Sequence, residues 1–108
     1  DRDRLGQAFA NLIGNALRHA RGTPTIELGA HRRADGAIAL TVRDHGPGIA
    51  VDALPHVFDR YWQGRHRRGG AGLGLAIVRG IAQAHGGDAT VRNHPDGGAE
   101  FAIVLPAP

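Results

Sequence analysis

Two stretches of the chain carry apolar residues at helical spacing. Those of the first stretch are Leu5, Phe9, Leu12 and Ala16. A period of three to four residues is typical of an amphipathic helix, so we predict one from about Asp3 to His19, with Asp1 or Asp3 as its cap. Those of the second stretch are Leu75, Val78, Ile81 and Ala82. They predict another helix, which His85-Gly86-Gly87 should end.

Two further stretches alternate apolar and polar residues, as strands do. The alternating apolar residues are Ile26, Leu28 and Ala30 in the first, which should face one way, and Ile38, Leu40 and Val42 in the second. Asp35-Gly36 between them is a hairpin turn signal, so the two strands should pair antiparallel. Asp44 should close the second strand.

The rest of the chain completes a fold of two layers. Residues 52–62 predict a short helix, and the Gly- and Arg-rich segment 63–74 predicts a mobile loop. Residues 90–92 and 101–105 predict two more strands around the turn Pro95-Asp96-Gly97. The expected fold class is α/β (α+β): a two-layer sandwich with a mostly antiparallel mixed sheet and helices packed on one face.

The composition excludes several kinds of chemistry. The 108 residues suit one domain and include no Cys, Met, Ser or Lys. These absences exclude disulfides, zinc-thiolate sites, a Ser-His-Asp triad and a Walker A loop. The net charge of +3 rests on Arg alone and is modest, so we expect no nucleic-acid partner. Because the chain lacks Met and starts at Asp1, with no apolar run of membrane-spanning length, we expect a soluble fragment of a longer protein.

The first predicted helix carries a polar stripe. Its members, which fall within about 80° of one another and well away from the apolar stripe, are Gln7, Asn11, Asn15 and Arg18. A solvated face would explain most such stripes. Two Asn in mid-helix argue for more, because Asn is a poor helix former. Amide oxygens suit a hard cation such as Mg²⁺, and Arg suits phosphate.

Two Gly-rich loops add candidate chemistry. Asp44 precedes a loop with Gly46 and Gly48, where the backbone can approach a ligand closely and the carboxylate can accept a hydrogen bond from an exocyclic amine. A plain turn is the alternative. The Gly-rich run 69–74 leads straight into the second helix, and backbone N–H groups at a Gly-rich helix start can bind an anion. Alone, it is also compatible with a flexible hinge.

These motifs, in this order, resemble the catalytic ATP-binding domain of bacterial sensor histidine kinases, which has the Bergerat (GHKL-type) ATPase fold. The matching segments are Asn11–His19 (N box), Asp44–Ile49 (G1 box), Val57–Trp62 (F box), Gly70–Val78 on to Gly87 (G2 box and its helix) and Gly98–Pro106 (closing strand). The family domain usually begins with a strand before the N-box helix, so we expect this chain to lack that strand.

The resemblance implies roles for individual residues. Asn15 would hold Mg²⁺, and Asn11, Asn15 and Arg18 would form the catalytic set. Asp44 would accept the adenine amine, and residues 63–71 would be the ATP lid, whose base Phe58 and Tyr61 would anchor. The residues implied to bind ATP are Asn11, Asn15, Arg18, His19, Asp44, Gly46, Gly48, Ile49, Phe58, Tyr61, Gly70, Gly72, Leu73, Gly74 and Leu75.

The resemblance also implies an activity and partners. Relatives that hydrolyse ATP carry Glu at position 11, as do anti-sigma-factor serine kinases, whereas Asn11 is no base and favours transfer to a histidine. None of the seven His precedes an acidic residue, so the phosphoacceptor would lie in a separate dimerisation domain, which later passes the phosphoryl group to a response regulator. We expect a cytoplasmic domain of a membrane-anchored homodimer. A serine kinase or a non-catalytic nucleotide-sensing module are the alternatives.

Overall fold

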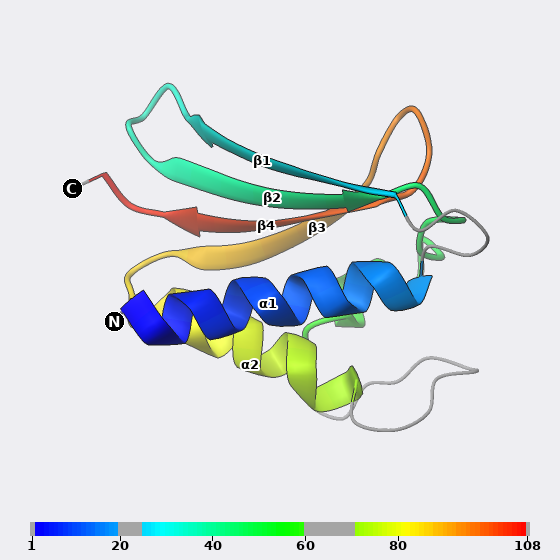
Figure 1. The fold of residues 1–108 in the computed structure, drawn as a ribbon, viewed down its shortest axis with the longest axis horizontal. Coiled ribbons are helices and arrows are strands. Elements are labelled where there is room, and N and C mark those ends of the chain that lie inside the picture. Colours follow the sequence, from blue (N-terminus) through cyan, green and yellow to red (C-terminus); the bar gives the residue numbers. More distant parts are fainter. Residues whose placement is uncertain (1, 20–24, 60–70, 108) are drawn as a thin grey trace.

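The structure, a computed structural model, describes residues 2–19, 25–59 and 71–107, without the side chains of residues 18, 19 and 71–74. The elements in chain order are α1 (Arg2–His19), β1 (Ile26–Arg32), β2 (Ile38–Asp44), the 3₁₀ turn η1 (Leu54–His56), α2 (Ala71–Ala84), β3 (Asp88–Asn93) and β4 (Ala99–Leu105). Both helices lie on one face of the sheet (Figure 1). The predicted two-layer sandwich is therefore confirmed.

The strands form one sheet in the order β1-β2-β4-β3, and every neighbouring pair is antiparallel. The predicted hairpin between β1 and β2 is present, with Leu28 opposite Val42. Val42 in turn lies opposite Phe101 of β4. Because side chains alternate across a strand, these residues share the face that the helices cover. We expected a mixed sheet with some parallel pairing, but all the described strands pair antiparallel.

The core lies between this face and the two helices. Its buried apolar residues come from both helices, three strands and the segment after η1, and they are Ala8, Leu12, Ala16, Val42, Val57, Phe58, Leu75, Val78, Ile81, Ala82, Ala89, Ala99, Phe101 and Ile103. The rings of Phe58 and Phe101 meet edge to face, with centroids 6.1 Å apart. This contact fixes the segment after η1 to β4.

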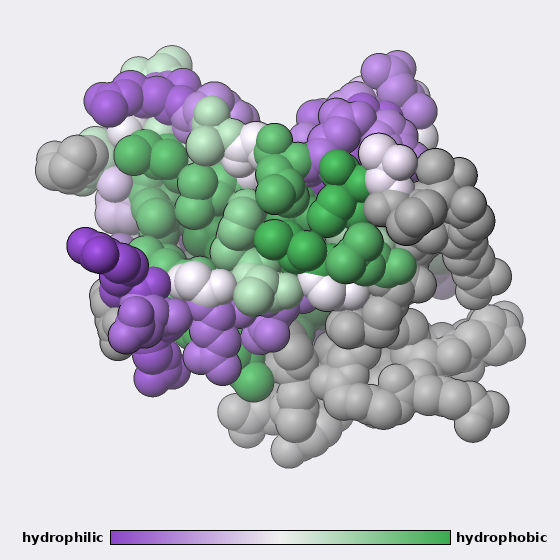
Figure 2. All heavy atoms as spheres, in the orientation of Figure 1, coloured by the Kyte–Doolittle hydropathy of each residue, from purple (hydrophilic) through white to green (hydrophobic). Residues whose placement is uncertain are grey.

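The edge strand β1 is only partly covered. Ile26 packs against the core, whereas Leu28 on the same face is 55% exposed. Figure 2 shows apolar surface gathered between α1 and the edge strand β1. The alternation correctly predicted which way the β1 side chains face, but it could not predict burial, because few residues of α1 reach this strand.

Two predicted helices differ from the structure in extent. The helix predicted for 52–62 is reduced, within the described residues, to η1 flanked by turns. Pro55 is one reason, because it lacks the N–H that an α-helix needs. Conversely, α2 starts at Ala71, inside the segment predicted to be a loop. The rest of that loop, residues 63–70, lies outside the described residues.

The end of α2 follows the sequence prediction. The N–H of Gly87 donates to the carbonyl of Ala82 at 2.9 Å, and that of Gly86 donates to Gln83 at 3.0 Å. Gly86 has φ +84°, and this pair of bonds with a left-handed residue is the Schellman motif. None of the described helices is both long and apolar enough to cross a membrane.

The uncovered face of the sheet carries charged pairs across neighbouring strands. Arg92 Nε donates to Glu100 Oε1 at 2.8 Å, and Arg43 lies 3.9 Å from Glu27. One side chain of each pair, Glu27 or Arg92, is more than half exposed, so each pair contributes no more than about 1 kcal/mol to stability. They keep this face polar without adding a site.

Candidate functional site

Three of the predicted site segments that the structure describes meet at one end of the sandwich. The helices run antiparallel, so the last turns of α1 and the first turn of α2 lie at the same end, together with the end of β2 (Figure 1). Asn15, Asp44 and the Gly72–Leu75 turn all belong to these three element ends. The topology therefore brings three of the sequence motifs together.

Asn15 departs from the sequence expectation that its stripe lies well away from the apolar one. Its residue surface is 2% exposed, beside the buried Leu12 and Ala16, while Gln7 is exposed and Asn11 half-buried. The reason is that α1 contacts both the sheet and α2, which makes its buried arc wider than its apolar stripe. The solvated-face interpretation is therefore wrong for Asn15.

The buried amide of Asn15 is also incompletely bonded. Its Oδ1 atom is buried and accepts no hydrogen bond from the residues that the structure describes. A buried acceptor without a partner costs about 1–3 kcal/mol, so folded proteins rarely keep one without a reason. A ligand that bonds to this oxygen would remove this cost, and an amide oxygen suits a hard cation.

Asp44 is the other buried polar residue among those described, also 2% exposed. As the last residue of β2 it shares the helix-facing side with Val42. Its Oδ1 accepts the N–H groups of Gly46, at 2.9 Å, and Ala99, at 3.1 Å. Among the described residues nothing donates to Oδ2. The turn-capping role considered for Asp44 is therefore real, and the carboxylate still has one oxygen free for a ligand.

The loop after Asp44 adopts a shape that its glycines permit. Gly48 has φ +81°, and a Cβ atom there would lie 2.9 Å from Asn93 Oδ1. Side chains rarely tolerate this backbone region, so Gly48 is needed for the loop path itself. Gly46 donates its N–H to Asp44, and Ile49 packs its side chain against the core.

Phe58 is placed in the core, and sequence reasoning missed the residue that covers it. The guanidinium carbon of Arg79, on α2, lies 5.3 Å from the centre of the Phe58 ring. Arg79 also bonds Asp88, with Nε 2.9 Å from Oδ1 and an Nη atom 3.4 Å from Oδ2. The hydrogen bond from Arg79 holds the pKa of Asp88 below its ordinary value, and the N–H of Ala89 adds to this effect.

The remaining predicted residues are described only in part. Gly72, Leu73 and Gly74 lie in the first turn of α2, and Leu75 is a buried core residue behind them. Helix N-terminal N–H groups favour anions, so this turn suits phosphate. Tyr61 and Gly70 lie outside the described residues, as do the side chains of Arg18 and His19 at the end of α1.

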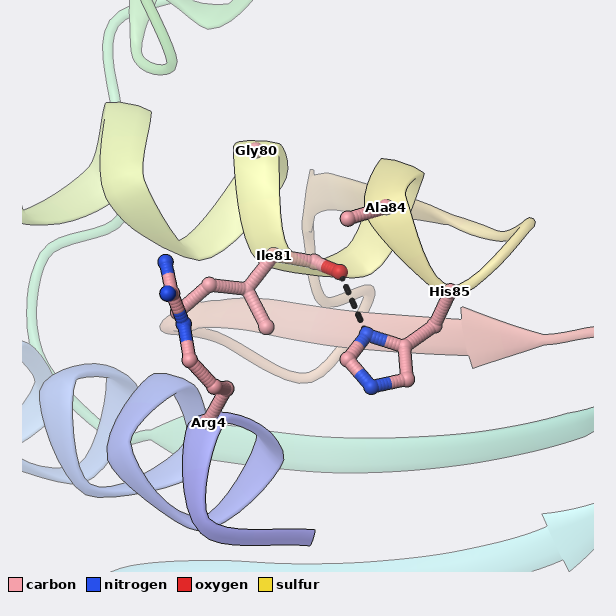
Figure 3. Close-up of a pocket in the computed structure, with 5 residues that line it drawn as sticks. All are labelled: Arg4, Gly80, Ile81, Ala84 and His85. Carbon is pink, nitrogen blue, oxygen red and sulfur yellow. Dashed lines mark hydrogen bonds between the residues drawn. The ribbon is translucent and has the colours of Figure 1, made fainter. Parts of the chain in front are cut away.

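Two observations concern possible binding sites outside this end of the sandwich. No group of three or more His, Cys, Asp or Glu side chains able to hold a metal occurs among them. A hollow of about 360 Å³ lies at the opposite end of the helix pair, lined by Arg4, Gly80, Ile81, Ala84 and His85 (Figure 3). None of the predicted site residues lines it. Its His85 Nδ1 donates to the Ile81 carbonyl at 2.8 Å.

The chain is similar to known proteins in both sequence and structure. The sequence matches, over residues 1–108, the family described as histidine kinase-, DNA gyrase B-, and HSP90-like ATPase. The sensor histidine kinase component HK1 of Mycobacterium tuberculosis (strain ATCC 25618 / H37Rv) is 48% identical, over 100% of this chain and 64% of the relative. The signal transduction histidine-protein kinase AfsQ2 of Streptomyces coelicolor is also 48% identical, over 98% of this chain and 20% of the relative.

Solved structures show the same fold. The mycobacterial sensor histidine kinase MprB superposes with a TM-score of 0.81 at 32% identity, covering 98% of this chain and 74% of that one. Full-length ShkA in complex with AMPPNP has a TM-score of 0.79 at 37% identity, covering 95% of this chain and 21% of ShkA.

The chain therefore belongs to the histidine kinase-, DNA gyrase B-, and HSP90-like ATPase family. Within this family it is homologous to the ATP-binding domain of sensor histidine kinases, as the sequence motifs implied. It spans only 64% of HK1 and 20% of AfsQ2, both of which contain further chain.

Proposed function

We propose that this chain is the catalytic ATP-binding domain of a two-component sensor histidine kinase, which transfers the γ-phosphoryl group of ATP to a histidine on a separate dimerisation domain. One observation carries the proposal. The two buried polar residues among those described, Asn15 and Asp44, each keep an oxygen that no described protein group satisfies. They belong to the last turns of α1 and to the end of β2, which lie at the same end of the sandwich as the first turn of α2 (Figure 1).

Each element would bind a different part of the nucleotide. Asp44 Oδ2 would accept the amine of adenine, because a carboxylate is an acceptor and that amine is a donor. Gly46, Gly48 and Ile49 would line the base. The N–H groups of Gly72 to Leu75, at the N-terminus of α2, would face the phosphates. Arg18 and His19 would contact phosphates or ribose.

Magnesium fits the residues present. The orphaned, buried oxygen of Asn15 is the kind of neutral oxygen ligand that Mg²⁺ accepts alongside phosphate oxygens and water. Asn11, half-buried one turn earlier on the same stripe, would order the phosphates or the waters around the ion. When bound, Mg²⁺ supplies positive charge that offsets the charge of the phosphates.

Phosphoryl transfer requires mainly that the reacting groups be positioned and that the charge of the phosphates be neutralised. Transfer of a phosphoryl group needs the attacking atom in line with the leaving oxygen, and the protein has little covalent chemistry to perform. Asn15, Arg18 and the α2 turn would hold the phosphates. Asn11 offers an amide in place of a base, so it cannot activate water, and this favours an imidazole nucleophile over hydrolysis.

The partners follow from the same proposal. The dimerisation domain with the phosphoacceptor would lie elsewhere in the protein, as the further chain of the relatives suggests. The phosphoryl group would then pass to a response regulator. The complete protein would be a membrane-anchored homodimer with this domain in the cytoplasm and no contact with nucleic acid.

The test is reconstitution with an acceptor. The chain is mixed with the histidine-bearing dimerisation domain of a relative such as AfsQ2, and γ-labelled ATP and Mg²⁺ are added. The proposal predicts label on that domain that acid removes and alkali does not, as expected of phosphohistidine. Replacing the acceptor histidine by Gln in that domain is the control and should abolish labelling.

The same experiment separates the alternatives. A serine kinase would label protein in an acid-stable form. A nucleotide-sensing module would bind Mg·ATP in calorimetry and transfer no label to any of several acceptor domains. Release of free phosphate in the absence of an acceptor would indicate hydrolysis and would contradict the role given to Asn11.

A further inference from the structure

We propose that Asn93 is a positioning residue of the nucleotide site, which holds the loop after Asp44 in the shape that base recognition requires. This inference rests on the proposed function, because it concerns the same site. Asn93 is the last residue of β3 and belongs to none of the sequence motifs.

Asn93 uses both ends of its amide on a single residue of the loop. Its Oδ1 accepts the N–H of Ile49 at 2.8 Å, and its Nδ2 donates to the carbonyl of Ile49 at 2.7 Å. Two bonds to one backbone unit reproduce what a neighbouring strand would offer. The two residues are 44 positions apart in the chain. The amide of Asn93 thus ties the loop to the far hairpin of the sheet.

The loop has little other support. Among the described residues, those from 46 to 49 make no backbone-to-backbone hydrogen bond. Apart from the Ile49 side chain, which packs on the core, the loop is held by Asp44 at one end and by Asn93 at the other. The side chain of His45, at the start of the loop, also meets Glu27, with Nε2 2.6 Å from Oε2. Removing the amide of Asn93 would therefore free the only polar tie that the described residues give to the far end of the loop.

The tie to Asp44 and the tie to Asn93 are linked through one pair of opposite residues in the β3–β4 ladder. Asn93 lies directly opposite Ala99 in the β3–β4 ladder, and the N–H of Ala99 donates to Asp44 Oδ1. One residue of this pair therefore holds the start of the loop and the other holds its end. Gly98 allows the close approach, because a Cβ atom there would meet the Asp44 carbonyl at 1.9 Å. Arg43 anchors the hairpin turn by donating to the Gly97 carbonyl at 3.0 Å.

Because of where Asn93 lies, its side chain can be removed without disturbing the rest of the fold. The side chain is exposed and lies at the end of its strand, so its loss removes no core contact and no ladder bond. What it fixes is the loop that would face the base. A looser loop should weaken contacts to the base and leave contacts to the phosphates unchanged.

The experiment compares two ligands that share only the phosphates. The affinities of the chain for Mg·ATP and for magnesium tripolyphosphate are measured by calorimetry for the wild type and for Asn93→Ala. The variant should lose roughly 3- to 30-fold in ATP affinity, the effect of one to two modest hydrogen bonds, with no change for tripolyphosphate. The amide of Ile49 should also exchange its hydrogen faster.

Two further variants make the result specific. Arg92→Ala removes an exposed side chain from the preceding residue, which pairs with Glu100 on the other face, and should bind both ligands like the wild type. Asn93→Asp keeps the shape and the acceptor but loses the donor to Ile49 and sets a carboxylate oxygen against its carbonyl. It should lose at least as much ATP affinity as Asn93→Ala, and it decides the matter if that variant does not fold.

The outcomes distinguish this inference from the function beneath it. A wild-type chain that binds no Mg·ATP would overturn the proposed function, whatever the variants do. A wild type that binds, with a folded Asn93→Ala or Asn93→Asp variant within twofold of it, would overturn only the role of Asn93. Equal losses for ATP and tripolyphosphate would overturn that role as well, since they would indicate a general loss of structure.

Discussion

Asp44 and Asp88 lie at opposite ends of the sheet and differ in how exposed they are and in how many of their oxygens are hydrogen-bonded. Asp44 ends β2, whereas Asp88, opposite Val104, is level with Ala39 of β2. Five residues of strand, about 17 Å, separate the two levels. The side chain of Asp88 is 45% exposed, and both of its oxygens bond Arg79. Asp44 is 2% exposed, pairs with no cation among the described residues and uses one oxygen only.

On the proposed function, this difference separates a carboxylate that stabilises the fold from one that binds a ligand. Both oxygens of Asp88 accept hydrogen bonds from Arg79, which joins β3 to α2. Asp88 therefore contributes to the stability of the fold and needs no ligand. Asp44 is buried with an acceptor left over, and burial of a charged group without a full set of partners is costly. Asn15 repeats the pattern at the same end. Incomplete bonding there is what a bound nucleotide would complete.

The largest expected effect comes from the pair Asp44→Asn and Asp88→Asn. In Asp44→Asn the amide oxygen can still accept the N–H groups of Gly46 and Ala99, so the turn is retained and only Oδ2 becomes a donor. A hydrogen bond to a charged group contributes about 1.5–3 kcal/mol, so Mg·ATP affinity should fall roughly 10- to 150-fold. Asp88→Asn should leave it unchanged in the same calorimetry. Equal losses in both variants would remove the distinction between the two ends.

Asn15→Ala should have the next largest effect, and only with metal present. Loss of a group that orders a metal site typically costs roughly 10- to 100-fold in affinity, so Mg·ATP should bind that much more weakly. Metal-free adenosine, which lacks phosphates, should bind as it does to the wild type. Titrations of both ligands measure this. Equal losses for the two ligands would argue against Asn15 as a magnesium ligand.

A change on α1 away from the site should alter stability instead. Gly6 lies on the exposed side of the helix, and a Cβ atom there would meet nothing within 4 Å. Gly6→Ala should raise the free energy of unfolding by about 0.5–1 kcal/mol, because Ala favours a helix interior, and leave Mg·ATP affinity unchanged. Urea unfolding and calorimetry check the two parts. An altered affinity would mean that binding depends on the whole helix rather than on Asn15.

The smallest expected effect is the pH dependence of Asp88. The pKa of Asp88 is lower in the folded chain than its ordinary value of 3.8, so its stabilising contribution is present above that value and is lost as pH falls further. The pair is partly exposed, so this contribution is below about 1 kcal/mol. Urea unfolding from pH 6 to pH 3 should show Asp88→Asn less stable than wild type at pH 6, with the difference shrinking below pH 4. A constant difference would refute this account of the Arg79 pair.

Sequence reasoning found those parts of the molecule that depend on local patterns. The helical spacing on α1, the turn at Asp35-Gly36 and the end of α2 at Gly86 are encoded within a few residues, and the structure has all three. The order of the motifs also sufficed to identify the family. The length of η1 was overestimated, because the pattern gave too little weight to Pro55.

What sequence reasoning missed depends on contacts between distant segments. The burial of Asn15 follows from the packing of α2 on α1, which no pattern within α1 encodes. Asn93 and Arg79 act on partners in other segments, Ile49 and Phe58. Asn93 lies in none of the motifs, and Arg79 lies in the helix of the G2 box at a position to which the motif assigns no role. For Gly48 the sequence suggested a role in lining a pocket, whereas its positive φ and the closeness of Asn93 give it a structural reason.

The most direct test of the central claim is the base selectivity of Asp44. Competition binding of ATP and GTP is measured on the wild type and on Asp44→Asn, after circular dichroism has established that both are folded. The adenine amine donates to a carboxylate, whereas guanine presents a carbonyl at that position, which the new amide could meet. The account predicts that the wild type prefers ATP and that the ATP/GTP affinity ratio shrinks in the variant. An unchanged ratio would contradict the claim that the free oxygen of Asp44 reads the base.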